Sequence, residues 1–229
     1  MNSSSVLSVS SLWFKYSIGS RRLESNVNQS LSQNHWIFRD FSLYAKPGEI
    51  IRILGVSGSG KTTLLKLLAG IEIPVKGQIL FRNVPIHSLD FWQRMDLRRT
   101  IISIIISDYF ELHDLSLKEL MNLYLQPKAI DIFVDYLYHF EIKNIGRAVL
   151  NDFSKGQQDL ILILLALAKR PKLLLLDEPT SNLDYRKAMA LEELLVSESK
   201  KHQLITLIAT HDKRIGKNWR TIHIGSTNS

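Results

Sequence analysis

Nine residues at 55–63, GVSGSGKTT, constrain the fold of this chain more than any other stretch. Gly55, Gly60, Lys61 and Thr62 fit the pattern G-x-x-x-x-G-K-[ST] and directly follow the apolar run IIRIL. That run predicts a short buried strand, and TTLLKLLAG, which comes next, has the apolar spacing and terminal glycine of a helix. A strand, a glycine-rich loop and a helix in this order predict a loop whose backbone amides curl around phosphate oxygens.

The loop predicts a site for a nucleoside triphosphate rather than for a dinucleotide. Lys61 supplies a positive charge for the outer phosphates, the Thr62 hydroxyl is a ligand for magnesium, and the helix start adds its positive end. The dinucleotide pattern G-x-G-x-x-G fails because Thr63 stands at its third glycine position. The predicted binding residues are Gly55, Ser57, Gly58, Ser59, Gly60, Lys61, Thr62 and Thr63.

A second constellation follows the apolar run LLLL at 173–176, where Asp177 and Glu178 end a predicted buried strand. A strand of this kind delivers its last residues to the carboxyl edge of a parallel sheet, where nucleotide sites of open α/β folds lie. Asp177 then suits magnesium, and Glu178 suits the polarisation of an attacking water. Taken alone, the sequence DEP is equally compatible with a helix cap at a strand exit.

The rest of the chain alternates apolar strand patterns with helix patterns, which predicts an α/β fold with a mostly parallel sheet covered on both faces. Residues 5–16 and 36–44 read as further strands, and residues 17–35 as a long exposed loop. Residues 108–150 carry helix patterns without strands. We therefore expect a single domain over 1–229, with a nucleotide-binding core at 5–106 and 151–226 and a helical insertion at 108–150.

Composition narrows the classes of function. Cysteine is absent, which excludes disulfides, thiolate metal sites and cysteine nucleophiles and is typical of a reducing compartment. The net charge is +7, but the basic residues are spread along the chain, so we expect an ordinary solvated surface and no nucleic-acid partner. No apolar run approaches the roughly 20 residues that span a bilayer. We expect a cytoplasmic protein without a secretory leader.

Three motifs in the second half of the chain carry a family resemblance. They are FSKGQQ at 153–158, LLLLDEPTSNLD at 173–184 and IATHD at 208–212. Together with the phosphate loop, in this order, they resemble the ATP-binding cassette (ABC) family from about Tyr16 to His211. The resemblance implies a P-loop NTPase core of the ABC type with an N-terminal antiparallel β subdomain, which binds ATP and Mg²⁺. It also implies a homodimer that sandwiches ATP, and a separate transmembrane permease through which the chain is associated with the inner face of the cell membrane.

The resemblance assigns roles to residues outside the phosphate loop. Ser154, Gly156 and Gln157 would bind the γ-phosphate of an ATP held by the other subunit, Asp184 would join the two sites, and His211 would contact the γ-phosphate. A serine hydroxyl and backbone amides at a helix start are suited to an anion. Without the resemblance, Ser154 is an ordinary helix cap and His211 an ordinary histidine at the end of a strand.

An aromatic residue at the end of the first strand would stack on adenine in such a protein. Tyr16 stands at that place, and Trp13 and Phe14 compete for the role. Packing within the sheet explains an aromatic residue there equally well.

The chain departs from the family pattern in several places. Ser107 stands where a glutamine is usual, which puts the coupling between the helical insertion and the nucleotide in doubt. Leu160 and Leu165 replace common arginines, and Lys155 replaces the commonest glycine of its motif. Arg52 is a charged residue inside a strand that should be apolar, and nothing in the sequence explains it.

Two hypotheses follow. The first is a transport ATPase subunit that hydrolyses ATP, with catalytic residues Lys61, Glu178 and His211, and drives a membrane partner. By analogy, that partner would export a peptide, lipid, lipoprotein or antibiotic. The second, prompted by Ser107, is a nucleotide-gated regulatory module of a membrane complex with weak or no turnover.

Overall fold

The computed structural model describes residues 6–16, 36–106, 112, 114–143, 145 and 148–225. The predicted loop at 17–35 and the Ser107 position therefore lie outside the described residues. None of the described helices is long and apolar enough to cross a membrane.

The strands form two sheets. Four strands pair antiparallel in the order β2-β1-β4-β5: β1 (Leu7–Phe14), β2 (Phe38–Ala45), β4 (Lys76–Phe81) and β5 (Val84–Pro85). Five strands pair parallel in the order β6-β7-β8-β3-β9: β3 (Ile50–Leu54), β6 (Ile102–Ile105), β7 (Leu173–Asp177), β8 (Ile205–Ala209) and β9 (Arg220–His223). This confirms the predicted α/β class with an antiparallel N-terminal sheet.

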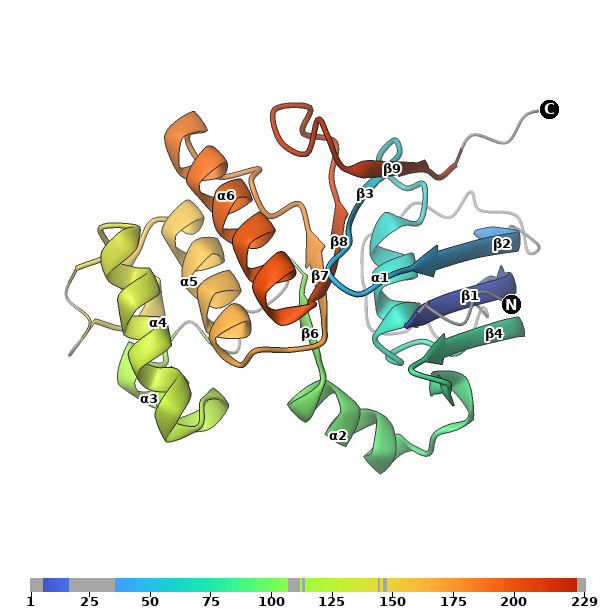
Figure 1. Cartoon of the computed structure of the whole chain (residues 1–229), viewed down its shortest axis with the longest axis horizontal. Coiled ribbons are helices and arrows are strands. Elements are labelled where there is room, and N and C mark those ends of the chain that lie inside the picture. Colours follow the sequence, from blue (N-terminus) through green and yellow to red (C-terminus); the bar gives the residue numbers. More distant parts are fainter. Residues whose placement is uncertain are drawn as a thin grey trace.

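Helices connect and cover these strands. The α-helices are α1 (Lys61–Leu68), α2 (Phe91–Thr100), α3 (Leu117–Tyr124), α4 (Pro127–His139), α5 (Lys155–Ala168) and α6 (Tyr185–His202). Two short 3₁₀ turns cover Ile86–Ser88 and Leu150–Asp152. In Figure 1, α5 and α6 lie on one side of the parallel sheet, while α1 and the antiparallel sheet lie on the other.

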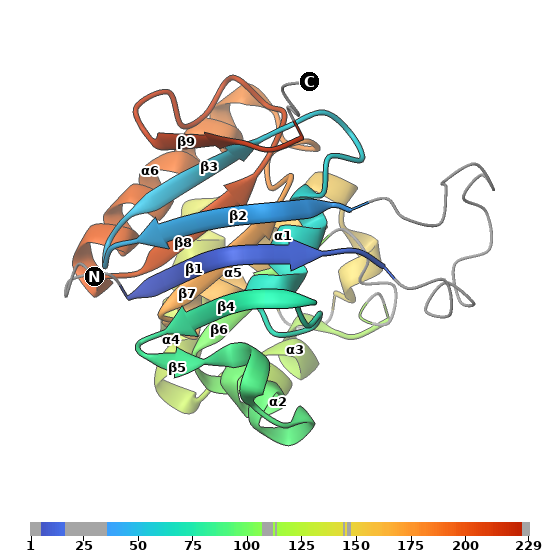
Figure 2. The ribbon, with the colours of Figure 1, turned by 90° about the vertical axis from the view of Figure 1, so that its right-hand side faces the viewer.

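The leucines of β7 show why the sheet is buried on both faces. Successive side chains of a strand point to opposite faces. Leu174 and Leu176 accordingly pack with the cluster that includes α4, α5 and α6, while Leu173 and Leu175 pack with α1 and the antiparallel sheet. Figure 2 shows the strands β2, β1 and β4 of that second layer side by side. Apolar packing with β7 thus holds α1 against the parallel sheet, and with α1 it positions the glycine-rich loop that precedes the helix.

Two departures from the family pattern have structural explanations. Leu160 and Leu165 of α5 are 0% and 4% exposed, so the α5 positions that commonly carry arginine belong to the core here. Arg52 lies on β3, where its Nη1 donates to the carbonyl of Ile215 at 2.8 Å and its Nε to the Thr221 hydroxyl at 3.2 Å. Arg52 thereby ties β3 to the segment that leads into β9.

Candidate functional site

The glycine-rich loop ends at the first turn of α1, and its geometry depends on glycine. Gly60, directly before α1, has a φ of 96°, and a Cβ there would lie 2.5 Å from Cγ2 of Ile37. An L side chain is disfavoured both by this φ and by the contact. Lys61 is 10% exposed, and its Nζ donates to the carbonyls of Gly55 at 2.8 Å and Val56 at 3.3 Å. The Lys61 side chain therefore folds back over the loop and is hydrogen-bonded to its first two residues.

Thr62 and Asp177 bring two oxygen donors together from α1 and the end of β7. The Thr62 hydroxyl donates a short hydrogen bond to Oδ2 of Asp177. Burial raises the pKa of the Asp177 carboxyl, and the hydrogen bond from Thr62 opposes that rise. Within the described part of the chain, no group of three or more His, Asp or Glu side chains could hold a metal ion. A hydroxyl and a single carboxylate nevertheless fit magnesium, which keeps waters and takes its other ligands from substrate phosphates.

Glu178 follows Asp177 and is held in a fixed orientation. Its backbone has a φ of 49°, which is uncommon for a residue other than glycine and places it at a sharp exit from β7. The Thr210 hydroxyl donates to its Oε2 at 2.9 Å, and the backbone N–H of His211 does so at 3.2 Å. Nδ1 of His211 lies 2.8 Å from Oε1, and the ammonium of Lys61 lies 3.9 Å from the same oxygen. The carboxylate thus faces one cation and three hydrogen-bonding groups.

The order of the parallel sheet explains this convergence. Strands β7, β8 and β3 are neighbours, so their carboxyl ends share one edge. Lys61 follows β3, Glu178 follows β7 and His211 follows β8. The three residues predicted to be catalytic from separate motifs therefore lie together, where the ligand sites of open α/β sheets are found.

The FSKGQQ motif forms the start of α5. Ser154 caps the helix, since its hydroxyl accepts from the backbone N–H of Gln157, whose side chain accepts from the backbone N–H of Ser154. A Cβ on Gly156 would overlap the carbonyl oxygen of Asn182, so the helix start packs tightly on the loop after Glu178. Ser154 is exposed and Gln157 is half-buried at this end of the helix. This arrangement presents a rigid hydroxyl and backbone amides at an exposed helix start.

Asp184 caps the next helix, α6. Its carboxylate accepts from the backbone N–H of Lys187 at 2.8 Å. The Asp184 carboxylate is therefore held at the first turn of α6, where the loop that follows Glu178 ends.

Tyr16 is the aromatic residue that contacts the phosphate-loop helix. Its hydroxyl lies 3.3 Å from Oγ1 of Thr63, and its ring meets Phe14 edge to face. Phe14 itself is buried, and Trp13 packs edge to face against Trp36. Of the three aromatic candidates, Tyr16 is the one joined to the residues of the phosphate loop.

Sequence reasoning missed Thr210 and a group around Asp212. Thr210 is fully buried and orients Glu178, yet in the sequence it is only the residue before a histidine. Asp212 accepts hydrogen bonds from Thr180 at 2.8 Å and from Arg214. Thr210 and Asp212 are the sequence neighbours of His211, which could have marked them as site residues. Arg214 stands outside the motifs, so no feature of the sequence pointed to it.

The fold and site agree with comparisons to known proteins. The profile described as ABC transporter matches residues 38–181. The lipoprotein-releasing system ATP-binding protein LolD 2 of Chlorobaculum tepidum is 31% identical in a match 188 positions long, which covers 77% of this chain and 76% of that protein. The Fe(3+) ions import ATP-binding protein FbpC of Photobacterium profundum is 32% identical over 178 residues, which are 77% of this chain but only 50% of that protein.

Solved structures give the same result. The cbiO1 protein of Clostridium perfringens, described as part of the ABC transporter complex cbiONQ, is 29% identical with a TM-score of 0.70, covering 91% of this chain and 79% of that one. The dimeric cassette MJ0796, bound to ADP and Pi in a post-hydrolysis state, has a TM-score of 0.78 at 23% identity, covering 95% and 94%. That second likeness concerns the fold. The chain belongs to the ABC transporter family, and it is an ATP-binding subunit of the ABC ATPase type.

Proposed function

We propose that two copies of this chain hydrolyse two ATP molecules between them and so drive a separate membrane permease. The observation that carries the proposal is the meeting of Lys61, Glu178 and His211 at one sheet edge, from three motifs far apart in the sequence. A buried cation next to an oriented carboxylate is the arrangement that hydrolysis of a phosphoanhydride requires.

The reaction is in-line attack of water on the γ-phosphorus. Glu178 orients that water and takes its proton, Lys61 stabilises the negative charge on the transferred group, and His211 contacts the γ-phosphate. Thr62 and Asp177 would hold magnesium. When bound, magnesium would neutralise charge on the β- and γ-phosphate oxygens. Tyr16 packs on the adenine ring.

The second half of each site comes from the partner copy. Ser154, Gly156 and Gln157 at the start of α5 bind the γ-phosphate of an ATP held by the facing phosphate loop, and Asp184 lies where the two sites meet. Support comes from the rigid, exposed helix start and from the dimeric cassette of the same fold. Each copy thus contributes to both sites.

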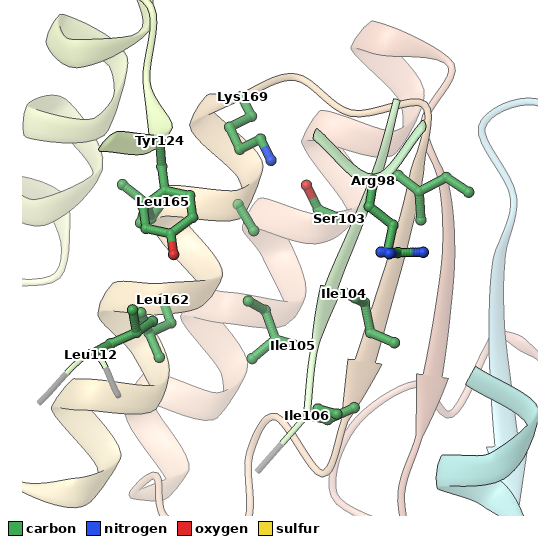
Figure 3. Close-up of a pocket in the computed structure, with 12 residues that line it drawn as sticks. Arg98, Ser103, Ile104, Ile105, Ile106, Leu112, Tyr124, Leu162, Leu165 and Lys169 are labelled. Carbon is green, nitrogen blue, oxygen red and sulfur yellow. The ribbon is translucent and has the colours of Figure 1, made fainter. Parts of the chain in front are cut away.

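The permease docks in a groove between the core and the helices at 108–150, which act as a helical subdomain. A cavity of about 260 Å³ opens there, with an apolar lining that includes Ile104, Ile105, Leu162 and Leu165. Figure 3 shows these side chains with Arg98 and Lys169, both on the cavity wall. Burial lowers the pKa of both cations. An amphipathic helix of the permease with an acidic residue fits this combination of apolar wall and partly buried positive charge.

The chain works on the inner face of the membrane and the transported substrate leaves the cell. Among the expected substrates, a peptide, lipid, lipoprotein or antibiotic, the similarity to the lipoprotein-releasing protein favours a lipoprotein. Import is the second candidate, because the iron-import proteins are about as similar. Cells that lack the chain should accumulate an exported substrate and should be depleted of an imported one.

The test of the ATPase proposal is phosphate release by the purified chain and its Glu178→Gln variant. We expect turnover by the parent chain and a loss of about hundredfold or more in the variant, which should collect as an ATP-bound dimer. Turnover near the parent rate in the variant would refute the role of Glu178. ATP-dependent dimerisation without turnover by the parent, even with its permease, would favour the regulatory module suggested by Ser107.

The test of the docking groove is photo-crosslinking in the native cell. A crosslinking residue in place of Leu123, which is 65% exposed on α3 near Tyr124 and Lys169, should capture an integral membrane protein. The same residue in place of Tyr44, exposed on the antiparallel sheet, is the control. Equal capture at both positions would contradict docking in the groove.

A further inference from the structure

The segment after His211 is held from two directions. On one side, Arg52 of β3 donates to the carbonyl of Ile215. On the other, Arg214 reaches the loop between Glu178 and Asp184. Its Nη2 donates to the carbonyl of Thr180 at 3.0 Å and its Nη1 to that of Leu183 at 3.4 Å. The segment that carries His211 is therefore attached to the sheet and to this loop, which has no regular secondary structure of its own.

Asp212 completes the second attachment. Arg214 donates to its carboxylate from Nε at 3.0 and 2.9 Å, and Nη2 lies 2.7 Å from Oδ2. The hydroxyl of Thr180, which is fully buried, donates to the same Oδ2 at 2.8 Å. The Asp212 side chain is 9% exposed, so its carboxylate has little contact with water, whereas the Arg214 side chain is 39% exposed. A fork-like guanidinium that serves one carboxylate and two carbonyls fixes all three in place.

The same hydrogen-bond network continues to Glu178, the proposed general base. The backbone N–H of Asp212 donates to the Thr210 hydroxyl at 2.9 Å, and that hydroxyl donates to Glu178 at 2.9 Å. One continuous chain of hydrogen bonds thus runs from Arg214 through Asp212 and Thr210 to the catalytic carboxylate. Movement of the loop before Asp184 would move the groups that orient Glu178 and His211.

We propose that Arg214 is a positioning residue of the ATPase site, which ties the segment carrying His211 to the loop carrying Asp184. Arg214 acts through Asp212 and Thr180 and does not touch the nucleotide. Its contribution is to turnover rather than to the affinity for ATP, because the hydrogen bonds of Arg214 go to Asp212, Thr180 and Leu183 and none of these residues belongs to the phosphate loop. The inference rests on the roles proposed above for Glu178 and His211.

The experiment compares Arg214→Ala, Arg214→Lys and Thr180→Val with the parent chain. We expect Arg214→Ala to lower kcat about tenfold to hundredfold, as misplaced catalytic groups do, while KM for ATP changes by less than about twofold. Lysine keeps the charge but loses the fork, so Arg214→Lys should recover part of the lost kcat. Thr180→Val removes one donor to Asp212 at nearly constant volume and should lower kcat less than Arg214→Ala does.

Arg99→Ala is the matched control. Arg99 also pairs with an aspartate close in sequence, Asp96, at 2.8 Å, but on α2, and its side chain is 75% exposed. The kcat of the Arg99→Ala variant should equal that of the parent chain. Thermal melting of each variant checks folding, and if Arg214→Ala does not fold, Arg214→Lys and Thr180→Val decide.

Two outcomes would overturn the proposal. One is a kcat within about twofold of the parent in folded Arg214→Ala. If Arg214→Ala does not fold, the same result in both Arg214→Lys and Thr180→Val counts instead. The other is a KM that rises in proportion to any loss of kcat. If Glu178→Gln abolishes turnover while the Arg214 variants do not affect it, this inference alone is wrong. If Glu178→Gln retains turnover, the proposed mechanism is wrong.

Discussion

Nδ1 of His211 lies 2.8 Å from Oε1 of Glu178, while the Thr210 hydroxyl donates to the other carboxylate oxygen. Both oxygens of Glu178 are therefore oriented by the residues that follow β8, more than 30 positions along the chain. The carboxylate of Glu178, the proposed general base, therefore depends for its orientation on the pairing of β7 with β8.

The first prediction concerns this orientation. Thr210→Val removes the hydroxyl donor to Glu178 at nearly constant volume. A hydrogen bond to a charged group is worth about 1.5–3 kcal/mol, so we expect kcat to fall about tenfold or more. Thr206→Val is the control, since Thr206 is equally buried on β8 but contacts Ser199. Steady-state phosphate release should separate the two variants, and equal kcat values would contradict the role of Thr210.

The second prediction concerns the lysine of the phosphate loop. Lys61→Ala removes the cation that would meet the outer phosphates, so ATP affinity should fall about tenfold or more. Calorimetric titration with ATP measures this directly. Lys118→Ala, an exposed change on α3, should leave the affinity unchanged. An unchanged affinity in Lys61→Ala would show that the triphosphate does not bind in this loop.

The third prediction concerns the start of α5. The methyl group in Gly156→Ala would overlap the Asn182 carbonyl and push the helix start away from its loop. We expect the variant to bind ATP as a monomer with the affinity of the parent but to lose ATP-dependent dimerisation. Sedimentation of the variant in a Glu178→Gln background tests this. A normal dimer would mean that Gly156 is not part of the interface.

The fourth prediction concerns pH. Hydrogen bonds from the Arg214 guanidinium, together with those from backbone and Thr180, lower the pKa of Asp212 from 3.8 to about 2. A lowered pKa in the folded state stabilises the protein above the unfolded value, and this contribution is lost as the pH falls from about 4 to about 2.

Asp212→Asn should therefore lower Tm near neutral pH, and the difference from the parent should shrink progressively in that acid range. Asp96→Asn alters the exposed pair with Arg99 and should change Tm little at any pH. A Tm difference for Asp212→Asn that does not depend on pH would contradict the proposed ionisation.

Local patterns in the sequence predicted much of this fold. The helix predicted from TTLLKLLAG corresponds to α1 at Lys61–Leu68, and the buried strand predicted before Asp177 and Glu178 corresponds to β7 at Leu173–Asp177. Long apolar runs bounded by polar residues define such elements clearly. Strand β9 and helix α2 were not predicted. β9 is a short strand at the sheet edge, and α2 has no fully buried residue, so neither has a strong hydrophobic pattern.

Some residues of the site could likewise be predicted from the sequence, and others could not. Lys61, Asp177 and Glu178 stand in motifs whose spacing indicates the chemistry, whereas His211 could be named only from the family resemblance. The functions of Arg52 and Arg214 depend on partners 163 and 31 to 34 positions away, respectively. Contacts at that separation are set by tertiary packing and leave no local pattern to read.

The most direct test of the shared ATP site uses the absence of cysteine from the chain. Val56→Cys marks the phosphate loop, where Val56 is 74% exposed, and Lys155→Cys marks the start of α5. The two variants, each also carrying Glu178→Gln, are mixed and oxidised with ATP or ADP and magnesium. We expect a disulfide between the two different variants with ATP and none with ADP. Crosslinks that form equally with either nucleotide, or none at all between folded proteins, would contradict a nucleotide held between two copies.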